Sequence, residues 1–369
     1  MIGRRAFLHA GLGSVVAGPL FAALKNRRWQ AAEDVLEKAT KSKQVSAATL
    51  FVKQGQTETA GAFGSADSPD AMFLLGSISK PISVSGLMTL YDEGKFRLDN
   101  PAAKFLPEFK GEGREKITIR QLLTHVSGLP DQLPENAMLR KSHAPLSEFV
   151  EHAVKTPLLF PPGSKYSYSS MGILLATEIA QRIVKQDFLK FLDEAVFRPL
   201  EMKHSAIGLG SFELKDLVPA QVEKAAVESG AGDPAAREWD WNSPYWRKLG
   251  APWGSVHASA PDIGKFLNAF LHPEGKMLSA QTARLMVKNH NPEGFTARGL
   301  GFGFQSQAGC PKGSPRTFGH TGSTGTLAWA DPLTDTICVV LTTLPGRAVS
   351  PHPRQLASDR VLACGDGSA

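Results

Sequence analysis

Apolar residues follow a strand pattern near both ends of the chain. Residues 47–64 read as two strands joined at Gln54-Gly55, which is the arrangement of a β-hairpin. Strand patterns return near the other end, at residues 301–306, 325–331 and 335–343. Strands at both ends predict one antiparallel sheet that is completed by segments far apart in the sequence.

Between these ends, apolar residues recur at helical spacing. In residues 146–155 they form one stripe along a helix, and 169–184 and 187–197 show the same spacing. A last helix is expected after Pro353, ending near Cys364. The polar residues 223–240 are interrupted by glycine and proline and predict a surface excursion.

This pattern predicts a single domain over residues 30–369, with a mainly helical region at about 101–254 inserted between sheet-forming segments. The fold class is α/β of the α+β type, an antiparallel sheet flanked by helices. A cleft between the two layers would be a natural site for a ligand.

Composition excludes several classes of protein. Apolar residues make up 42% of the 369 and charged residues 21%, as in a soluble globular protein. The net charge of +6 comes from scattered basic residues rather than a basic stripe with aromatics, so we expect no nucleic-acid partner.

The three cysteines match no zinc-binding spacing, and no His-Glu-x-x-His motif occurs, so we expect no metal. Cys338 lies in an apolar run and is expected in a buried strand. Cys310 and Cys364 could pair after export, which the sequence leaves open.

Residues 1–24 have the features of an export signal. Arg4-Arg5, followed by Phe7-Leu8, resembles the twin-arginine signature, and the apolar stretch after them is shorter than a membrane-spanning helix needs. An ordinary secretory signal is the alternative, and an uncleaved anchor would also fit. We therefore expect an exported protein, periplasmic or extracellular, with no membrane contact beyond that signal.

Candidate chemistry begins at Ser77 and Lys80, which lie three positions apart behind a glycine. On a helix, that spacing places both side chains on one face. A lysine can then take the hydroxyl proton of the serine, and the helix N-terminus favours developing negative charge. Pro81 is tolerated because the first N–H groups of a helix have no intrahelical partner.

Two other stretches strengthen this interpretation. Tyr168 lies where the loop of 161–175 opens into a helix, and the glycine-rich 318–326 precedes a strand. Together the three segments resemble the serine β-lactamase and penicillin-binding protein-like family, specifically its class C β-lactamase-related branch. Further similar segments follow in family order from about residue 40 to 345. The resemblance implies a β-lactamase/DD-peptidase-like fold.

The resemblance also implies a role for each matched residue. Ser77 would be the nucleophile that forms an acyl-enzyme, and Lys80 and Tyr168 would transfer protons, either one serving as the base. The backbone N–H groups of Ser77 and Ser323 would form the oxyanion hole. Substrate would be bound by the second and third motifs, at Ser170, His320, Thr321 and Gly322. No cofactor is implied.

This chain departs from the β-lactamase pattern at two positions. Ser170 replaces the asparagine of Tyr-x-Asn, and His320 replaces the lysine of Lys-Thr-Gly. A histidine near pH 7 is mostly neutral, so both changes weaken the case for β-lactam hydrolysis. They suit an ester or amide substrate that lacks the carboxylate, and His320→Lys is expected to raise activity on carboxylate-bearing β-lactams.

Other polar and aromatic residues are expected to have supporting roles. His125 is interpreted as a hydrogen-bonding support, and His257 as a residue behind the site rather than a catalytic one. For a cluster of aromatic residues, core packing and an apolar rim that selects the acyl group both remain open: Trp239, Trp241, Tyr245, Trp246 and Trp253.

We therefore expect a serine hydrolase that acts on a small-molecule or peptide substrate with an ester, amide or β-lactam group. Carboxylesterase-like activity is favoured, with β-lactamase or D-alanyl-D-alanine peptidase activity as the alternative. A protein of another class, a slowly acylating penicillin-binding sensor without turnover, would keep the same motifs.

Overall fold

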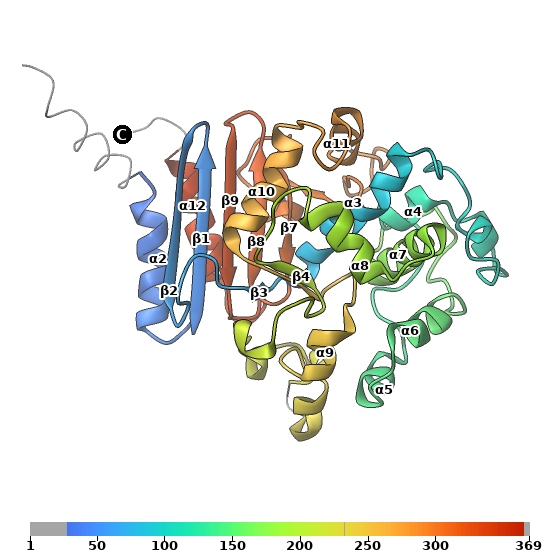
Figure 1. Ribbon diagram of the computed structural model, residues 1–369, viewed down its shortest axis with the longest axis horizontal. Helices are drawn as coiled ribbons and strands as arrows, with labels where there is room; N and C mark the ends of the chain where they lie inside the picture. Colours follow the sequence, from blue (N-terminus) through green and yellow to red (C-terminus); the bar gives the residue numbers. More distant parts are fainter. Residues whose placement is uncertain (1–27, 232, 365–369) are drawn as a thin grey trace, which may run out of the picture.

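The computed structural model describes residues 28–231 and 233–364. A six-stranded sheet lies at one side of the molecule, and a mainly helical region lies at the other (Figure 1). The expected export signal, residues 1–24, lies outside the described residues. No helix within the described part of the chain is long and apolar enough to cross a membrane.

The large sheet joins the two ends of the chain. Its strands are all antiparallel to their neighbours and run in the order β2-β1-β9-β8-β7-β6. Their bounds are Thr57–Gly64, Ala47–Gln54, Thr336–Thr342, Thr326–Asp331, Phe318–Gly322 and Gly303–Phe304. The predicted hairpin at 47–64 and the antiparallel sheet built from distant segments are thus confirmed.

Period-two alternation sends the side chains of each strand to two different cores. In β1, Ala47 and Phe51 belong to the core beneath α10 (Ala260–Leu271), whereas Leu50 and Val52 face the other way. That second face is covered by α2 (Gln30–Lys41) and α12 (Pro353–Ala363), which lie beside each other (Figure 1). The last helix therefore occupies the predicted segment.

One strand is shorter than expected. The strand expected at 301–306 shortens to β6, because a 3-10 helix begins at Gln305. The segment 318–326 leads into β8, as expected, and its first five residues themselves form β7. The helix expected at 187–197 begins as α8 (Phe188–Leu192) and continues as a π-helix (Asp193–Phe197).

A small second sheet was not predicted. It has the order β3-β5-β4, with bounds Phe73–Leu74, Val256–Ala258 and Ser205–Ile207. Strands of two or three residues are too short to show an alternating pattern, and all of these residues are buried. β3 matters for function because the chain passes directly from it into the segment that carries Ser77.

The helical region is organised around α3 (Ser79–Asp92), which is buried on nearly all sides. α7 (Ser170–Val184) packs against it and also contacts α4 (Ile119–Leu123), α6 (Leu146–Ala153) and α8. The remaining helices of this region and its surroundings are α5 (Asn136–Lys141), α9 (Pro244–Leu249) and α11 (Ala280–Met286).

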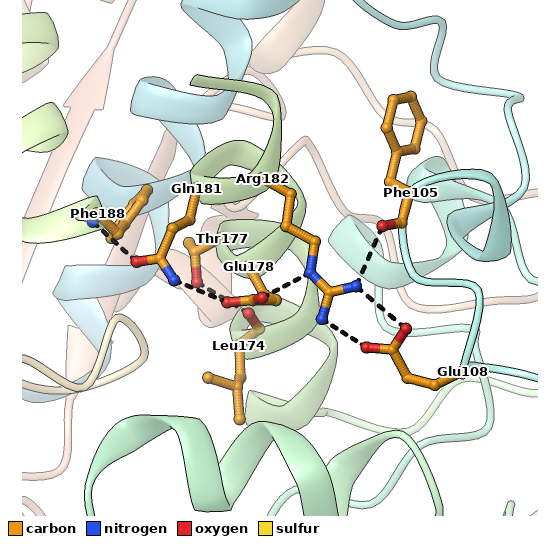
Figure 2. A network of polar contacts seen from close by, with 8 residues as sticks. All are labelled: Phe105, Glu108, Leu174, Thr177, Glu178, Gln181, Arg182 and Phe188. Carbon is orange, nitrogen blue, oxygen red and sulfur yellow. Dashed lines mark hydrogen bonds and ion pairs between the residues drawn. The ribbon is translucent and has the colours of Figure 1, made fainter. Parts of the chain in front are cut away.

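A polar network fixes α7 to the loop that precedes α4. Figure 2 shows the Arg182 guanidinium between Glu178, one turn earlier on α7, and Glu108 of the loop. The same guanidinium donates to the carbonyl of Phe105 at 3.3 Å. Hydrogen bonding to Arg182 lowers the pKa of Glu108, so the pair is kept ionised at neutral pH. α7 is therefore held in place near its C-terminal end, remote from Ser170.

The three cysteines form no disulfide in the structure. Cys338 is completely buried in β9, as predicted, and Cys310 is buried in the same core. Burial raises the pKa of the Cys310 thiol to about 12. The core therefore keeps this thiol protonated.

Candidate active site

Ser77 lies at the transition from β3 to α3. It is the middle residue of a 3-10 helix (Gly76–Ile78), which runs into α3 at Ser79. Gly76 has a φ of +57°, a left-handed conformation that glycine adopts without strain. This turn presents the Ser77 hydroxyl at the start of the helix, as the sequence predicted.

Lys80 is 1% exposed and its amine contacts the Ser77 hydroxyl. The Nζ–Oγ distance is 3.1 Å, and the same Nζ donates to the carbonyl of Trp253 at 3.0 Å. One turn of helix therefore produces a hydrogen-bonded hydroxyl–amine pair. Such a pair can pass a proton from the nucleophile to a neighbouring base.

Tyr168 lies next to Lys80 and is the third residue of this group. It directly precedes Ser169, which caps α7 by accepting from the N–H of Gly172 at 3.0 Å. The Lys80 Nζ lies 4.8 Å from the centre of the Tyr168 ring. The Tyr168 hydroxyl is buried and has no hydrogen-bond partner within the described part of the chain. It is thus available to exchange a proton with a reacting group.

A buried arginine that the sequence analysis missed connects two of the predicted residues. Nη2 of Arg298 lies 3.1 Å from Nε2 of His125 and 3.2 Å from Nε2 of His320. Its Cζ lies 5.7 Å from the centre of the Tyr168 ring. Arg298 is 1% exposed, so a permanent positive charge lies directly behind the catalytic group.

Arg298 also fixes the tautomer of His320. A guanidinium only donates hydrogen bonds, so Nε2 of His320 must accept and the ring carries its proton on Nδ1. Nδ1 of His320 then donates to the Thr321 carbonyl at 2.7 Å. Nδ1 of His125 lies 3.1 Å from both the carbonyl oxygen and the backbone nitrogen of Ser169. Burial and then the Arg298 charge lower the pKa of both histidines well below the usual value. His320 is therefore neutral and offers no charge to a substrate.

The residues that follow the third motif are hydrogen-bonded to the segment before Ser77. Thr324 and Thr326 donate their hydroxyl protons to the carbonyls of Leu74 and Leu75, both at 2.6 Å. A Cβ added at Gly76 would lie 3.0 Å from the backbone nitrogen of Ser323. The two nitrogens expected to form the oxyanion hole therefore belong to closely packed segments.

Ser170, the departure in the second motif, is engaged by an aspartate that the sequence analysis also missed. Its hydroxyl donates to Oδ1 of Asp131 at 2.5 Å, and its N–H donates to the same oxygen at 3.0 Å. Asp131 lies in the loop before α5, and no local sequence pattern distinguishes it from an ordinary loop residue. Ser170 therefore has no hydroxyl proton left for a substrate.

These groups line one cavity of about 580 Å³, a size suited to a small substrate. The predicted residues that line it are Ser77, Lys80, Tyr168, Ser170, His320, Thr321, Gly322 and Ser323. Arg354 of α12 lines it too and holds the third motif by donating to the Thr326 carbonyl at 2.8 Å.

Three residues of the aromatic cluster both pack in the core and line the cavity. Trp241, Trp246 and Trp253 are at most 6% exposed and belong to the core, yet they also line the cavity. Tyr245 lines a separate recess and donates to the Ala144 carbonyl at 2.9 Å. The cavity thus combines one polar side with an apolar, aromatic side.

His257 lies in β5, is buried away from the cavity lining, and pairs with the carbonyl of Gly208 at 2.9 Å. Among the described residues, no group of three histidine, cysteine or acidic side chains could hold a metal ion.

Comparison of the sequence with known proteins gives matches over most of its length. The family model described as Beta-lactamase matches residues 32–361. A curated protein of Salmonella enteritidis PT4, named "Putative D-alanyl-D-alanine carboxypeptidase", is 26% identical over 312 residues. That alignment covers 76% of this chain and 71% of the relative.

Two solved structures share the fold. EstCE1, described as a hydrolase with promiscuous acyltransferase activity, has a TM-score of 0.75 at 18% identity. The D-amino acid amidase from Ochrobactrum anthropi SV3, complexed with D-phenylalanine, has a TM-score of 0.72 at 23% identity. Each match covers 92% of this chain and 99% of the other. The β-lactamase-like α/β fold, with its antiparallel sheet and helices, is confirmed.

Proposed function

This chain belongs to the Beta-lactamase family and is a serine hydrolase of that family, and from this premise we propose that it cleaves an ester or amide bond through an acyl-enzyme on Ser77. The observation that carries the proposal is the contact of 3.1 Å between the Lys80 amine and the Ser77 hydroxyl. The unpartnered Tyr168 hydroxyl beside this pair supports it.

The reaction follows from the geometry. Ser77 Oγ attacks the carbonyl carbon, and its proton passes to the Lys80–Tyr168 pair. The N–H groups of Ser77 and Ser323 hold the oxyanion that forms on the carbonyl oxygen. The C–O or C–N bond then breaks, and the pair returns the proton to the leaving alcohol or amine. A water molecule then loses a proton to the pair and attacks the carbonyl carbon of the acyl-enzyme. The bond from that carbon to Ser77 Oγ breaks, the pair returns the proton to Oγ, and the acid is released.

Carboxylesterase-like activity is the favoured form of this reaction. The third motif offers no cation to a substrate carboxylate, because His320 is held neutral by burial and by Arg298. EstCE1, which shares the fold, is described as a hydrolase with acyltransferase activity, consistent with ester chemistry on this scaffold.

An amide-cleaving peptidase is the second candidate. Arg347 lines the cavity, is exposed, and follows Gly346, whose N–H donates to the Ser323 carbonyl at 2.8 Å. A cation at that place could hold the carboxylate of a peptide substrate. The name of the Salmonella relative agrees with this candidate. β-Lactamase activity would use the same groups.

The test is steady-state hydrolysis of p-nitrophenyl acetate, nitrocefin and an N-acetylated D-alanyl-D-alanine peptide. We expect the ester to be the best substrate, no turnover in Ser77→Ala, and losses of about 10² or more in Lys80→Ala and Tyr168→Phe. Tyr166→Phe, a nearby phenol outside the Ser77 group, is the matched control. Near-normal ester turnover in Ser77→Ala would refute the nucleophile assignment.

A slowly acylating sensor without turnover would give a different result in the same experiment. A protein that acylates without turnover would release about one equivalent of p-nitrophenol and then stop. Mass spectrometry would find the acetyl group retained on Ser77. A faster reaction with nitrocefin than with the ester would instead overturn the esterase ranking.

A further inference from the structure

The last residue of the second motif, Ser170, offers only a hydrogen-bond acceptor to the cavity that it lines. Its single hydroxyl proton is donated to Oδ1 of Asp131, so Ser170 Oγ can only accept from a substrate. The family's carboxamide at this position would instead offer N–H donors to a substrate carbonyl. The acyl group that fits here must therefore bring its own donors.

Asp131 adds a negative charge to the same wall. It is the only carboxylate among the described residues that line the cavity. Oδ1 accepts from both the N–H and the hydroxyl of Ser170, and within the described part of the chain no hydrogen bond or ion pair involves Oδ2. Gln132 and Asn136, from the same part of the chain, also line the cavity but are uncharged.

Asp131 is not needed to cap α7. Ser169 already caps that helix through its own side chain, and Asp131 contacts it through one oxygen only. The residue remains exposed in the free protein, so its second oxygen is open to a ligand. An acceptor pair of net negative charge, facing a cavity, is complementary to a group that only donates and is positively charged.

Five cationic residues of the described part of the chain line the cavity as well, and two of them, Arg347 and Arg354, are held against a different wall from Asp131. The five are Lys80, Arg140, Lys224, Arg347 and Arg354. Arg354 donates to the carbonyls of Gly322 and Thr326, and Arg347 follows the residue bonded to Ser323. Both are thus tied to the third motif, whereas Asp131 is tied to the second. The aromatic side of the cavity, formed by Trp241, Trp246 and Trp253, can hold an apolar side chain of the acyl group.

We propose that Asp131 and Ser170 form a subsite for the ammonium group of the acyl half of the substrate, so that this enzyme acts on esters or amides of amino acids whose α-amino group is free. This inference rests on the proposed function of Ser77, and it names the class of acyl group. It also predicts discrimination against N-acylated substrates, because an acyl carbonyl finds no donor on Ser170 and meets the Asp131 carboxylate.

The first experiment compares kcat/KM for the p-nitroanilides of phenylalanine, N-acetyl-phenylalanine and 3-phenylpropanoic acid, using both enantiomers of the first two. We expect the free amine to be preferred over both analogues by about tenfold or more in one enantiomer. In Asp131→Asn, which keeps the oxygen that accepts from Ser170, this ratio should fall to near one. Asp67→Asn, an exposed aspartate outside the cavity, should retain the full ratio.

A second measurement does not depend on turnover. Calorimetric titration of Ser77→Ala with phenylalanine amide and with 3-phenylpropanamide measures binding of the ammonium directly. We expect phenylalanine amide to bind about tenfold more tightly, and Asp131→Asn in the same background to remove the difference. Equal affinities, or a ratio unchanged by Asp131→Asn, would overturn the subsite. Ser77-dependent hydrolysis of p-nitrophenyl acetate would stand regardless, which separates this failure from that of the proposed function.

Discussion

Replacing His320 with lysine should destabilise this protein, because a second cation would then lie against Arg298. Nε2 of His320 is 3.2 Å from Nη2 of Arg298, and both residues are buried. At an effective dielectric constant of about 20, two unit charges at that separation repel by about 5 kcal/mol. If the lysine ammonium relaxes to roughly 6 Å, about 3 kcal/mol remains.

We therefore expect His320→Lys to lower the free energy of unfolding by about 3 to 5 kcal/mol. Urea denaturation at pH 7.5 measures it, with neutral His320→Gln as the matched control for the change of shape. In the Arg298→Met background, His320→Lys should lower the free energy of unfolding much less. A double-mutant cycle over the two positions then gives their interaction energy.

The sequence alone predicts that lysine at this position raises β-lactam activity, and the structure changes that expectation. A lysine repelled by Arg298 would hold a substrate carboxylate only in a less stable protein. Equal stability of the His320→Lys and His320→Gln proteins, together with a tenfold gain on nitrocefin, would show that Arg298 does not control this position.

Two further predictions concern acid stability and export. His125, His257 and His320 have pKa values well below the usual 6.5 in the folded protein, so below about pH 6.5 the unfolded chain binds protons that the folded one does not. Stability should fall with falling pH by up to about 4 kcal/mol per pH unit for the three together, and urea unfolding that is flat from pH 7 to 5 would contradict this. We also propose twin-arginine export, so replacing residues 4 and 5 with lysines should leave the protein in the cytoplasm, as cell fractionation would show; unchanged export would indicate the ordinary secretory route.

The parts of the site that the sequence revealed are those in which local spacing carries the chemistry. Ser77 and Lys80 are joined by one helical turn, and Tyr168 lies next to the residue that caps α7. In each case the contact is set by neighbours in the sequence. The large sheet was predictable for the same reason, because β1 and β9 each contain an unbroken run of mostly apolar, buried residues.

The parts that the sequence did not reveal depend on tertiary packing. Arg298 reaches two histidines that are 173 and 22 positions away, and nothing in its own segment marks it as buried. Asp131 meets Ser170 across 39 positions. Both residues determine what the predicted motifs can do: one fixes the neutral form of His320, and the other takes the proton of Ser170.

The pairing of β1 with β9 also determines when during synthesis the enzyme can become active. β1 ends at Gln54 and its partner β9 begins at Thr336, so about nine-tenths of the chain must leave the ribosome before the sheet can close. Until then, β1 and β8 each keep an open edge, and the third motif lacks Arg354 of α12. A nascent chain therefore carries Ser77 while all the residues up to β9 are synthesised, without the groups that surround Ser77 in the folded site.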